Sequence, residues 1–275
     1  MALLKRLLRR LELEQRSHNV YIGGAGEGGV TADARLFGGL VAAQATMAAL
    51  KTVPTFPLHS LHAYFLKPGR PANDIEFHVS SNKDGRNFAV RSVAAIQGGE
   101  LIFQLQSSFQ RPTPGLHHQP QMPKVPEPES LPNRDQLRGR QNWRDMPVDV
   151  RMITPITGLE PLPGAQQLWL GVNGDLPDDP HLHLALAVYA SDRCLLDTAW
   201  RPHADQGELA GASLDHAMWF HEPPNFNDWL LYTTQSPAAN AGRGLAFGQM
   251  FNRQGELVVS VAQEGMLRVR PSAPD

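Results

Sequence analysis

The single cysteine and two pairs of histidines are the side chains whose types first suggest nucleophilic or metal chemistry. Cys194 has no histidine beside it in the sequence, and a lone cysteine of this kind is usually a small buried hydrophobe. His181 and His183 lie two residues apart in a helical pattern and cannot share a face. His216 and His221 lie five apart in a strand pattern and point to opposite faces. We therefore expect Cys194 to be structural, and we expect neither a metal site nor a cofactor.

We do not expect a serine hydrolase of the α/β type, because no Gly-x-Ser-x-Gly motif occurs in the 275 residues. Serine is a weak nucleophile unless a base lies beside it. An activated water molecule is therefore the simpler attacking group. His59 lies in a strand pattern and Gln44 in a buried helical pattern, and we expect both of them, like Asp215, to be structural residues.

Composition and charge are those of a globular protein. Hydrophobic residues make up 41% and charged residues 19% of the chain. The formal net charge is -2, so no bulk basic field draws the protein to nucleic acid. No run of 18 apolar residues predicts a membrane-spanning helix. One cysteine excludes an internal disulfide, and we expect a cytoplasmic location.

Residues 1–14 predict an amphipathic helix, because leucines recur with helical spacing from Leu3 to Leu11. Charged residues interrupt the apolar stretch too often for a secretory signal. We expect this helix to cap the edge of a domain. The alternative is a basic helix that lies on a membrane surface, and Glu12 and Glu14 weigh against it.

A proline-rich stretch divides the chain, and the two parts repeat one another. Residues 111–132 contain seven prolines, which predict an extended connection. We predict an N-terminal domain over 1–110, a linker over 111–140 and a C-terminal domain over 141–275. Three strand and hairpin patterns recur with shifts of 155, 157 and 156 residues, which indicates an internal duplication. The matched starting points are His62 and Ala217, Gly85 and Gly242, and Gly99 and Gly255.

Each part also contains one helix without a polar face, over 37–51 and 179–191. Such a helix must be buried on most sides. Asp179 and Pro180 provide the N-cap and first-turn signals of the second helix. The sequence therefore predicts an α+β fold in which an antiparallel sheet of about five strands wraps one buried helix in each half.

Six segments in order carry a family resemblance. They are residues 37–39, 59–69, 91–97, 189–192, 214–221 and 263–265. On these segments the chain resembles the acyl-CoA thioesterase II family over essentially its full length. The resemblance implies a double hot-dog fold, in which two hot-dog units are fused. It also implies an enzyme that hydrolyses fatty acyl-CoA to free fatty acid and CoA.

The resemblance further implies a catalytic set, which falls residue by residue on Asp192, Ser213 and Gln263. Asp192 would act as general base on a water molecule that Ser213 and Gln263 orient. Ser213 stands where some family members have threonine, and the hydroxyl is retained. The helix start at Gly38 and Gly39 is a candidate for the oxyanion donors, in which case the two halves share one site. Alternatively, these glycines only allow close packing.

Two other functions stay open, a hot-dog enoyl-CoA hydratase and a non-catalytic acyl-CoA-binding protein. The expected partner is an acyl-CoA substrate, with no nucleic acid and no membrane insertion. Because hot-dog units commonly pair, we expect a homo-oligomer, either a dimer or a tetramer. Arg86, Arg91, Arg243 and Arg268 are the candidates to hold the CoA phosphates, and the preferred acyl chain length is open.

Overall fold

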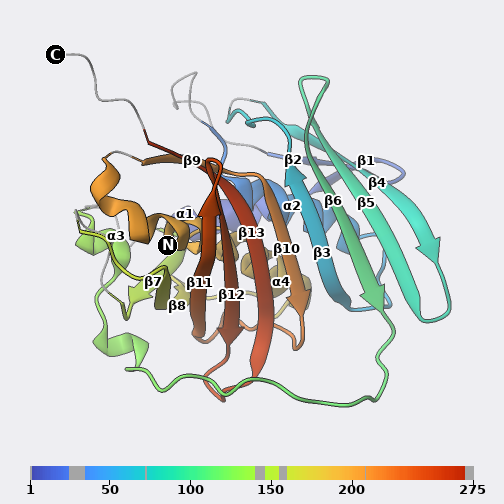
Figure 1. The fold of residues 1–275 in the computed structure, drawn as a ribbon. Helices are drawn as coiled ribbons and strands as arrows, with labels where there is room; N and C mark the ends of the chain where they lie inside the picture. Colours follow the sequence, from blue (N-terminus) through green and yellow to red (C-terminus); the bar gives the residue numbers. More distant parts are fainter. Residues whose placement is uncertain are drawn as a thin grey trace.

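A single curved antiparallel sheet is the centre of the computed structural model, which describes residues 2–24, 35–71, 73–139, 146–154, 160–207 and 209–269 (Figure 1). The N-terminal half contributes β1 (Glu14–Ser17), β2 (Val20–Gly23), β3 (Leu58–Phe65), β4 (Ile75–Asp84), β5 (Phe88–Gln97) and β6 (Glu100–Gln110). The C-terminal half contributes β7 (Val148–Met152), β8 (Ala165–Val172), β9 (Leu209–Ser213), β10 (Asp215–Phe220), β11 (Leu230–Asn240), β12 (Arg243–Phe251) and β13 (Leu257–Val269).

The strands follow the same order on both sides of the sheet's centre. At this centre β3 pairs with β10, and His62 lies opposite Ala217. Outward from this junction, the order β3-β6-β5-β4-β2 on one side matches β10-β13-β12-β11-β8 on the other. The repeated sequence patterns therefore lie in strands with equivalent places in the two halves. In the β5–β6 hairpin, Gly98 and Gly99 have φ angles of 59° and 79°, a conformation that favours glycine.

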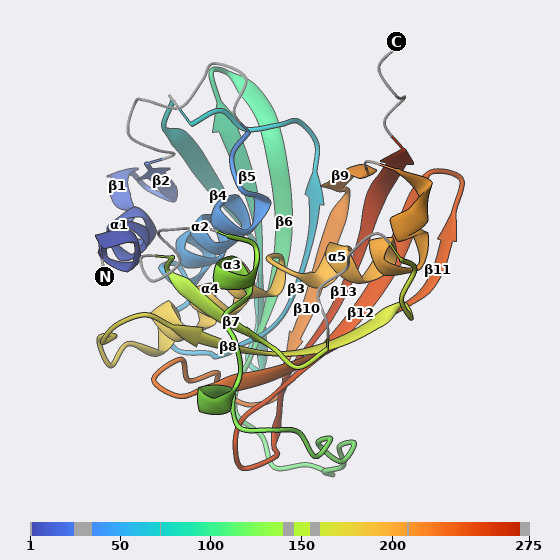
Figure 2. The same ribbon diagram turned by 90° about the vertical axis from the view of Figure 1, so that its left-hand side faces the viewer.

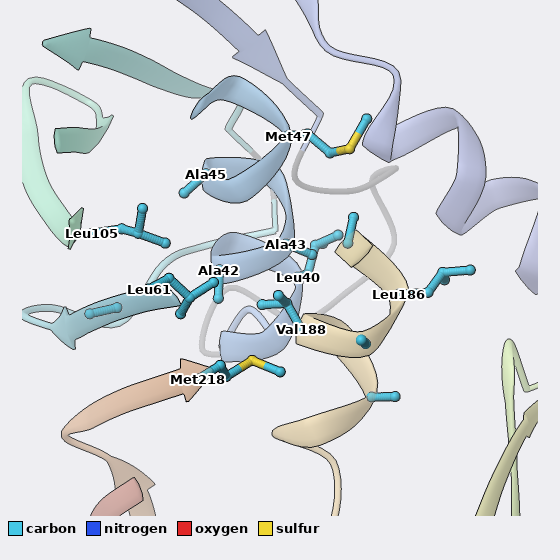
Figure 3. Packing of buried hydrophobic residues seen from close by; sticks show 14 of the residues in the cluster. Leu40, Ala42, Ala43, Ala45, Met47, Leu61, Leu105, Leu186, Val188 and Met218 are labelled. Carbon is cyan, nitrogen blue, oxygen red and sulfur yellow. The ribbon is translucent and has the colours of Figure 1, made fainter. Parts of the chain in front are cut away.

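Two apolar helices, α2 (Gly38–Leu50) and α4 (Pro180–Ser191), lie side by side within the curve of the sheet (Figure 2). In Figure 3, Leu40 and Ala43 of α2 lie beside Val188 of α4, and Ala45 points toward Leu105 of β6. Both helices are almost entirely buried, as their lack of a polar face predicts. Each lies within one residue of its predicted limits, because the flanking residues serve as caps.

Both halves carry more than the predicted five strands. In the part of the chain that the structure describes, the N-terminal half has six strands and the C-terminal half seven. The hairpin β1–β2 extends one edge, and β7 extends the other. The C-terminal half also inserts α5 (Leu195–Trp200), the 3₁₀-helix η3 (Arg201–Gln206) and β9 between α4 and β10. Residues 195–213 have no repeated counterpart, so the duplication did not predict these elements.

The N-terminal helix α1 (Ala2–Leu11) packs its apolar side on the core. Leu4, Leu7 and Leu11 are buried, and α1 contacts both α2 and α4. The helix therefore covers the edge of the fold, as expected, and these leucines are not available to a membrane surface. No described helix has both the length and the apolar character needed to cross a membrane.

The proline-rich segment is held against the C-terminal half. Residues 111–127 form neither helix nor strand, and they are followed by the 3₁₀-helix η1 (Pro128–Ser130) and by α3 (Arg134–Leu137). The side chain of Gln119 donates to the carbonyl of Gly255 over 2.7 Å. The indole of Trp169 donates to the carbonyl of Pro126 over 2.9 Å. The division into domains over 1–110 and 141–275 with a linker over 111–140 stays a prediction, but this segment is not a free tether.

Candidate active site

Asp192, Ser213 and Gln263 come from three different elements and meet at one point. Asp192 is the C-cap of α4, Ser213 ends β9, and Gln263 lies within β13. The Ser213 hydroxyl donates to Oδ1 of Asp192 over 3.1 Å. The Gln263 amide donates to the same oxygen over 2.6 Å and to Oγ of Ser213 over 2.9 Å. The structure thus brings together the three side chains that the resemblance implies.

Strand pairing and one close helix contact position this group. β9 runs antiparallel to β13, and Ser213 lies opposite Gly265, two residues from Gln263. Alternate residues of a strand point to the same face, so Gln263 and Gly265 both face inward. A β-carbon at Gly265 would lie 2.4 Å from Leu196 of α5. Glycine at this position therefore allows α5, which follows Asp192 in the chain, to lie directly on the sheet.

The N-terminal end of α2 completes the surroundings of the carboxylate. The backbone N–H of Gly39 donates to Oδ2 of Asp192 over 2.8 Å. The negative end of the α4 dipole disfavours a carboxylate at that position, whereas the positive end of α2 favours it. Residues of both halves therefore meet at this site, which agrees with the expectation that the start of α2 and Asp192 share one site. The Gly39 N–H, however, binds the carboxylate, so it is not available as an oxyanion donor.

Neighbouring groups also lie too close to Gly38 and Gly39 for a side chain at either position, which agrees with the alternative expectation of close packing. A β-carbon at Gly39 would lie 2.7 Å from the carbonyl oxygen of Tyr189, so a side chain there would separate α2 from α4. At Gly38 it would lie 2.8 Å from the ring of Phe65 and 3.2 Å from Oδ2 of Asp192. A side chain at Gly38 would therefore fill the space beside the carboxylate.

A cavity of about 550 Å³ opens onto Asp192 and Ser213. Its described lining is mostly apolar and comes from both halves. The apolar side chains are Leu36, Phe37, Val41, Phe65, Leu66, Pro68, Ile102 and Phe103 from the N-terminal half, and Leu196, Trp200, Ala212, Leu214 and Met266 from the C-terminal half. A larger cavity of about 730 Å³ is lined by Trp219 and Phe247, and the only charged residue in its described lining is Arg201. It contains no candidate base, so the smaller cavity is the candidate active site.

Three buried polar residues that the sequence analysis did not assign to the site support the end of α4. His216 Nε2 and the Ser191 hydroxyl are hydrogen-bonded at 2.8 Å, and the Tyr232 hydroxyl donates to the carbonyl of Ser191 over 3.2 Å. Ser191 directly precedes Asp192, so these bonds fix the backbone that carries the carboxylate. Burial lowers the pKa of His216 and raises that of Tyr232, so both stay neutral at pH 7. Ser191 and His216 lie in family-matching segments, whereas Tyr232 had no sequence signal.

Cys194 is a structural residue, as expected. It is 1% exposed, and burial raises the pKa of its thiol. The guanidinium of Arg134 in α3 donates to its sulfur over 3.3 Å and also pairs with Asp197 of α5. These contacts tie α3 to the chain that follows Asp192.

The other residues weighed from the sequence have structural partners. His59 bonds to Ser108 at 2.8 Å, Gln44 donates to the carbonyl of Arg10 over 2.9 Å, and Asp215 accepts from the backbone N–H of Glu264 over 2.6 Å. None of these three residues lines the cavity beside Asp192.

The four arginines considered for the CoA phosphates do not line the cavity beside Asp192. Arg91 is buried and pairs with Asp84 at 2.6 Å, and Arg243 pairs with Glu264 at 2.9 Å. The cationic residues in the described lining are Arg35 and Lys67. Lys67 lies in the family-matching segment 59–69, whereas Arg35 had no sequence signal that separated it from other surface cations.

Two family models and several curated proteins match this chain. The model named Acyl-CoA thioesterase matches residues 142–266, and the model named Acyl-CoA thioesterase N-terminal domain matches residues 27–110. The chain is 37% identical over 264 residues to acyl-coenzyme A thioesterase 8 of Mus musculus, covering 88% of this chain and 82% of that protein. It is 35% identical over 285 residues to acyl-CoA thioesterase 2 of Haemophilus influenzae, covering 97% and 98% respectively.

Solved structures match over nearly the whole chain. An acyl-CoA thioesterase II, TesB2, from Mycobacterium marinum matches with a TM-score of 0.82 and 39% identity, covering 98% of this chain and 100% of that one. A protein with a hot dog fold from Alicyclobacillus acidocaldarius matches with a TM-score of 0.76 and 18% identity, covering 96% and 98%, and this likeness concerns the fold alone. The predicted α+β double hot-dog fold is therefore confirmed.

Proposed function

The chain belongs to the acyl-CoA thioesterase II family and hydrolyses acyl-CoA thioesters, and we propose that Asp192, Ser213 and Gln263 are the residues that carry out the reaction. The observation that supports this proposal is the hydrogen-bonded contact of all three at one carboxylate, with Asp192 and Ser213 lining a largely apolar cavity. A site for an acyl-CoA thioester must hold an apolar acyl chain beside polar groups that act on the carbonyl. This cavity has an apolar lining and also contains Asp192 and Ser213.

In the proposed reaction Asp192 is the general base. Its carboxylate accepts three hydrogen bonds from the protein, two at Oδ1 and one at Oδ2. A carboxylate has about four lone-pair directions, so one remains for a water molecule in the cavity. The water transfers a proton to Asp192 as its oxygen attacks the thioester carbonyl carbon. Collapse of the tetrahedral intermediate then breaks the carbon–sulfur bond, and the thiolate of CoA takes up the proton.

Ser213 and Gln263 hold the base and orient the water. The Ser213 hydroxyl uses its proton toward Asp192 and accepts from Gln263, so the three side chains form a closed set of hydrogen bonds. Such a set fixes the carboxylate in one orientation before substrate arrives. Ser213 also lines the cavity, where its remaining lone pair can accept from the attacking water.

The developing oxyanion lies at the N-terminal end of α2 in this proposal. The first N–H groups of a helix have no partner within the helix, and they lie at its positive end. Gly38 is the first residue of α2, lines the cavity and lies next to Oδ2 of Asp192. Its N–H replaces that of Gly39 as the candidate oxyanion donor, because Gly39 is engaged by the carboxylate.

A cytoplasmic location and a homo-oligomer, dimer or tetramer, belong to the proposal as well. The homo-oligomer is supported by the tendency of hot-dog units to pair. Size-exclusion chromatography with light scattering measures the assembly directly.

The proposed chemistry is tested with wild-type protein and Ser213→Ala in a thiol-release assay, together with intact-protein mass measured during turnover. Attack by water predicts no acyl adduct on the protein and a partial loss in Ser213→Ala of about tenfold to 100-fold. An acyl group on Ser213, with all activity lost in Ser213→Ala, would show that the serine is the nucleophile. Crotonyl-CoA serves as a second substrate, because hydration of its double bond without thiol release would overturn the hydrolase assignment.

A further inference from the structure

The cavity beside Asp192 has two chemically different ends. Its cationic residues, Arg35 and Lys67, belong to the N-terminal half. On the other side of Asp192 and Ser213, the lining is mostly apolar and includes Leu196 and Trp200 of α5 and Met266 of β13. The one carboxylate in the described lining of this part, Asp197, pairs with Arg134 and Arg138. Acyl-CoA is also divided in this way, because its phosphates lie at one end and its acyl chain at the other, with the thioester between them.

Trp200 closes the apolar end of this cavity. Trp200 is the last residue of α5. A neighbouring cavity has a volume of about 330 Å³, and Trp200 is the only described residue that lines both cavities. The neighbouring cavity is bordered by His203, by residues 239–243 and by residues 267–269. The indole of Trp200 therefore separates two spaces that would otherwise join.

The ring of Trp200 is held by packing. A β-carbon at Gly211 of β9 would lie 2.5 Å from Cζ2 of Trp200, so the absence of a side chain at Gly211 gives the ring its place. The indole nitrogen is buried and has no hydrogen-bond partner. Because no hydrogen bond anchors the ring, a phenyl or isobutyl group can take its place without leaving a polar partner unsatisfied.

We propose that Trp200 is the residue that limits the acyl chain length in this enzyme. This inference rests on the proposed function, because it requires the thioester to lie at Asp192 with its acyl chain directed toward α5. Chains that end at the indole bury every methylene, and longer chains must displace the ring or leave carbons outside. Each methylene that gains or loses burial changes binding about fourfold, so a few carbons beyond the limit are strongly disfavoured.

The opposite orientation would place CoA at Trp200 and the acyl chain toward Phe65 and Phe103. It is the weaker arrangement, because the cations beyond Trp200 are separated from Asp192 by the indole itself. Ion pairing does not distinguish the two ends, since Arg243 pairs with Glu264 at 2.9 Å and Lys67 pairs with Glu100 at 2.7 Å. Arg35 and Lys67, in contrast, line the same cavity as Asp192.

The test measures kcat/KM by thiol release for saturated acyl-CoAs from butyryl-CoA to stearoyl-CoA. Trp200→Ala joins the two cavities. The ratio of kcat/KM for longer chains to kcat/KM for the chain length that the wild type prefers should therefore rise at least tenfold. Trp200→Leu and Trp200→Phe keep a side chain at the position and should give smaller shifts in the same order. They also keep the test informative if the alanine variant does not fold.

Trp219→Ala is the matched control, because Trp219 is 37% exposed and lines the other, larger cavity. Its chain-length profile should equal that of the wild type. An unchanged profile in folded Trp200 variants overturns the inference, and so does an equal rise of KM for all chain lengths, which would place CoA at Trp200. Failure of the wild type to release thiol from any acyl-CoA would instead refute the proposed function.

Discussion

The ends of the two central helices occupy equivalent places in the two halves, yet only one of them forms a candidate site. At the end of α4 the C-cap is Asp192, and β13 supplies the buried amide of Gln263. At the end of α2 the C-cap is Lys51, and Ser107 of β6 stands where Gln263 stands in β13. Ser213 has no counterpart, because β9 is part of the segment inserted in the C-terminal half.

The N-terminal half fills its equivalent place with its own side chain. Arg91 lies opposite Ser107 in the sheet, and the corresponding neighbour of Gln263 is Ala246. The Arg91 guanidinium donates to the hydroxyl of Thr52 over 3.1 Å and pairs with Asp84 at 2.6 Å. One half thus satisfies its polar groups internally, which favours stability. The other keeps an anion at the C-terminal end of α4, where the unfavourable dipole of α4 is offset by the hydrogen bond from the start of α2.

Among the changes that test this difference between the two helix ends, Asp192→Asn should have the largest effect on activity. Asparagine keeps the volume but cannot accept the proton of water, so kcat should fall about 10³-fold or more. An amide has one accepting oxygen where the carboxylate has two, so the bond from Gly39 or those from Ser213 and Gln263 are lost, and Tm should fall modestly. Thiol release and thermal unfolding of the same preparation check both effects. Wild-type turnover in a folded Asp192→Asn protein would refute the role of the carboxylate.

Removing the Gln263 amide, which holds the base, tests the second residue that distinguishes the end of α4 from the end of α2. Gln263→Ala should lower kcat about 100-fold, because the carboxylate loses its 2.6 Å partner and its fixed orientation. Ser107→Ala, at the equivalent position of the N-terminal half, is the matched control. Its kcat should equal that of the wild type, and a comparable loss there would mean that both helix ends take part in catalysis.

Arg91→Met tests whether the N-terminal end is purely structural. The variant loses the hydrogen bonds that the buried guanidinium donates to the hydroxyl and carbonyl of Thr52 and to the carbonyl of Lys83, so unfolding free energy should fall by about 2–3 kcal/mol. The pair with the exposed Asp84 adds little to this, because solvent screens it. Chemical denaturation gives the loss, and kcat of the folded protein should not change. Arg86→Met, at an exposed arginine nearby, should affect neither quantity.

The smallest effect concerns His216, whose counterpart in β3 is the apolar Leu61. Burial lowers the pKa of His216 below 6.5, so as pH falls below 6.5 the unfolded chain binds a proton that the folded protein does not. Wild-type unfolding free energy should therefore decrease as pH falls through this range. The slope from this one histidine is at most about 1.4 kcal/mol per pH unit.

His216→Leu copies the N-terminal half and should make this decrease shallower. Some slope remains, because burial also lowers the pKa of His59, His183 and His221. The variant also loses the hydrogen bond to Ser191, so its stability at pH 7 should be about 1 kcal/mol lower. Denaturation at a series of pH values measures both quantities. Equal slopes in the two proteins would show that His216 is not the group that titrates.

Local pattern was sufficient to predict α2, α4 and the repeated hairpins, because an apolar helix and a glycine turn are determined by nearby residues. The resemblance named Asp192, Ser213 and Gln263, but their contact depends on the pairing of β9 with β13. Sequence reasoning could not find the bond from Gly39 to Asp192, because 153 residues separate them. Nor could it tell the buried Arg91 from Lys67 at the cavity, since both read as cations near strand ends.

The way the proline-rich segment lies on the molecule bears on how the chain avoids exchanging parts with its neighbours. Duplicated proteins can swap a half between two molecules when the hinge between the halves is loose. Here Gln119 bonds to Gly255 and accepts from the N–H of Leu257, and the carbonyl of Pro126 binds the indole of Trp169. These bonds leave a short stretch between the end of β6 at Gln110 and Gln119 as the hinge. The connection is therefore fixed to the C-terminal half, and the candidate site in this structure is formed by the two halves of one chain.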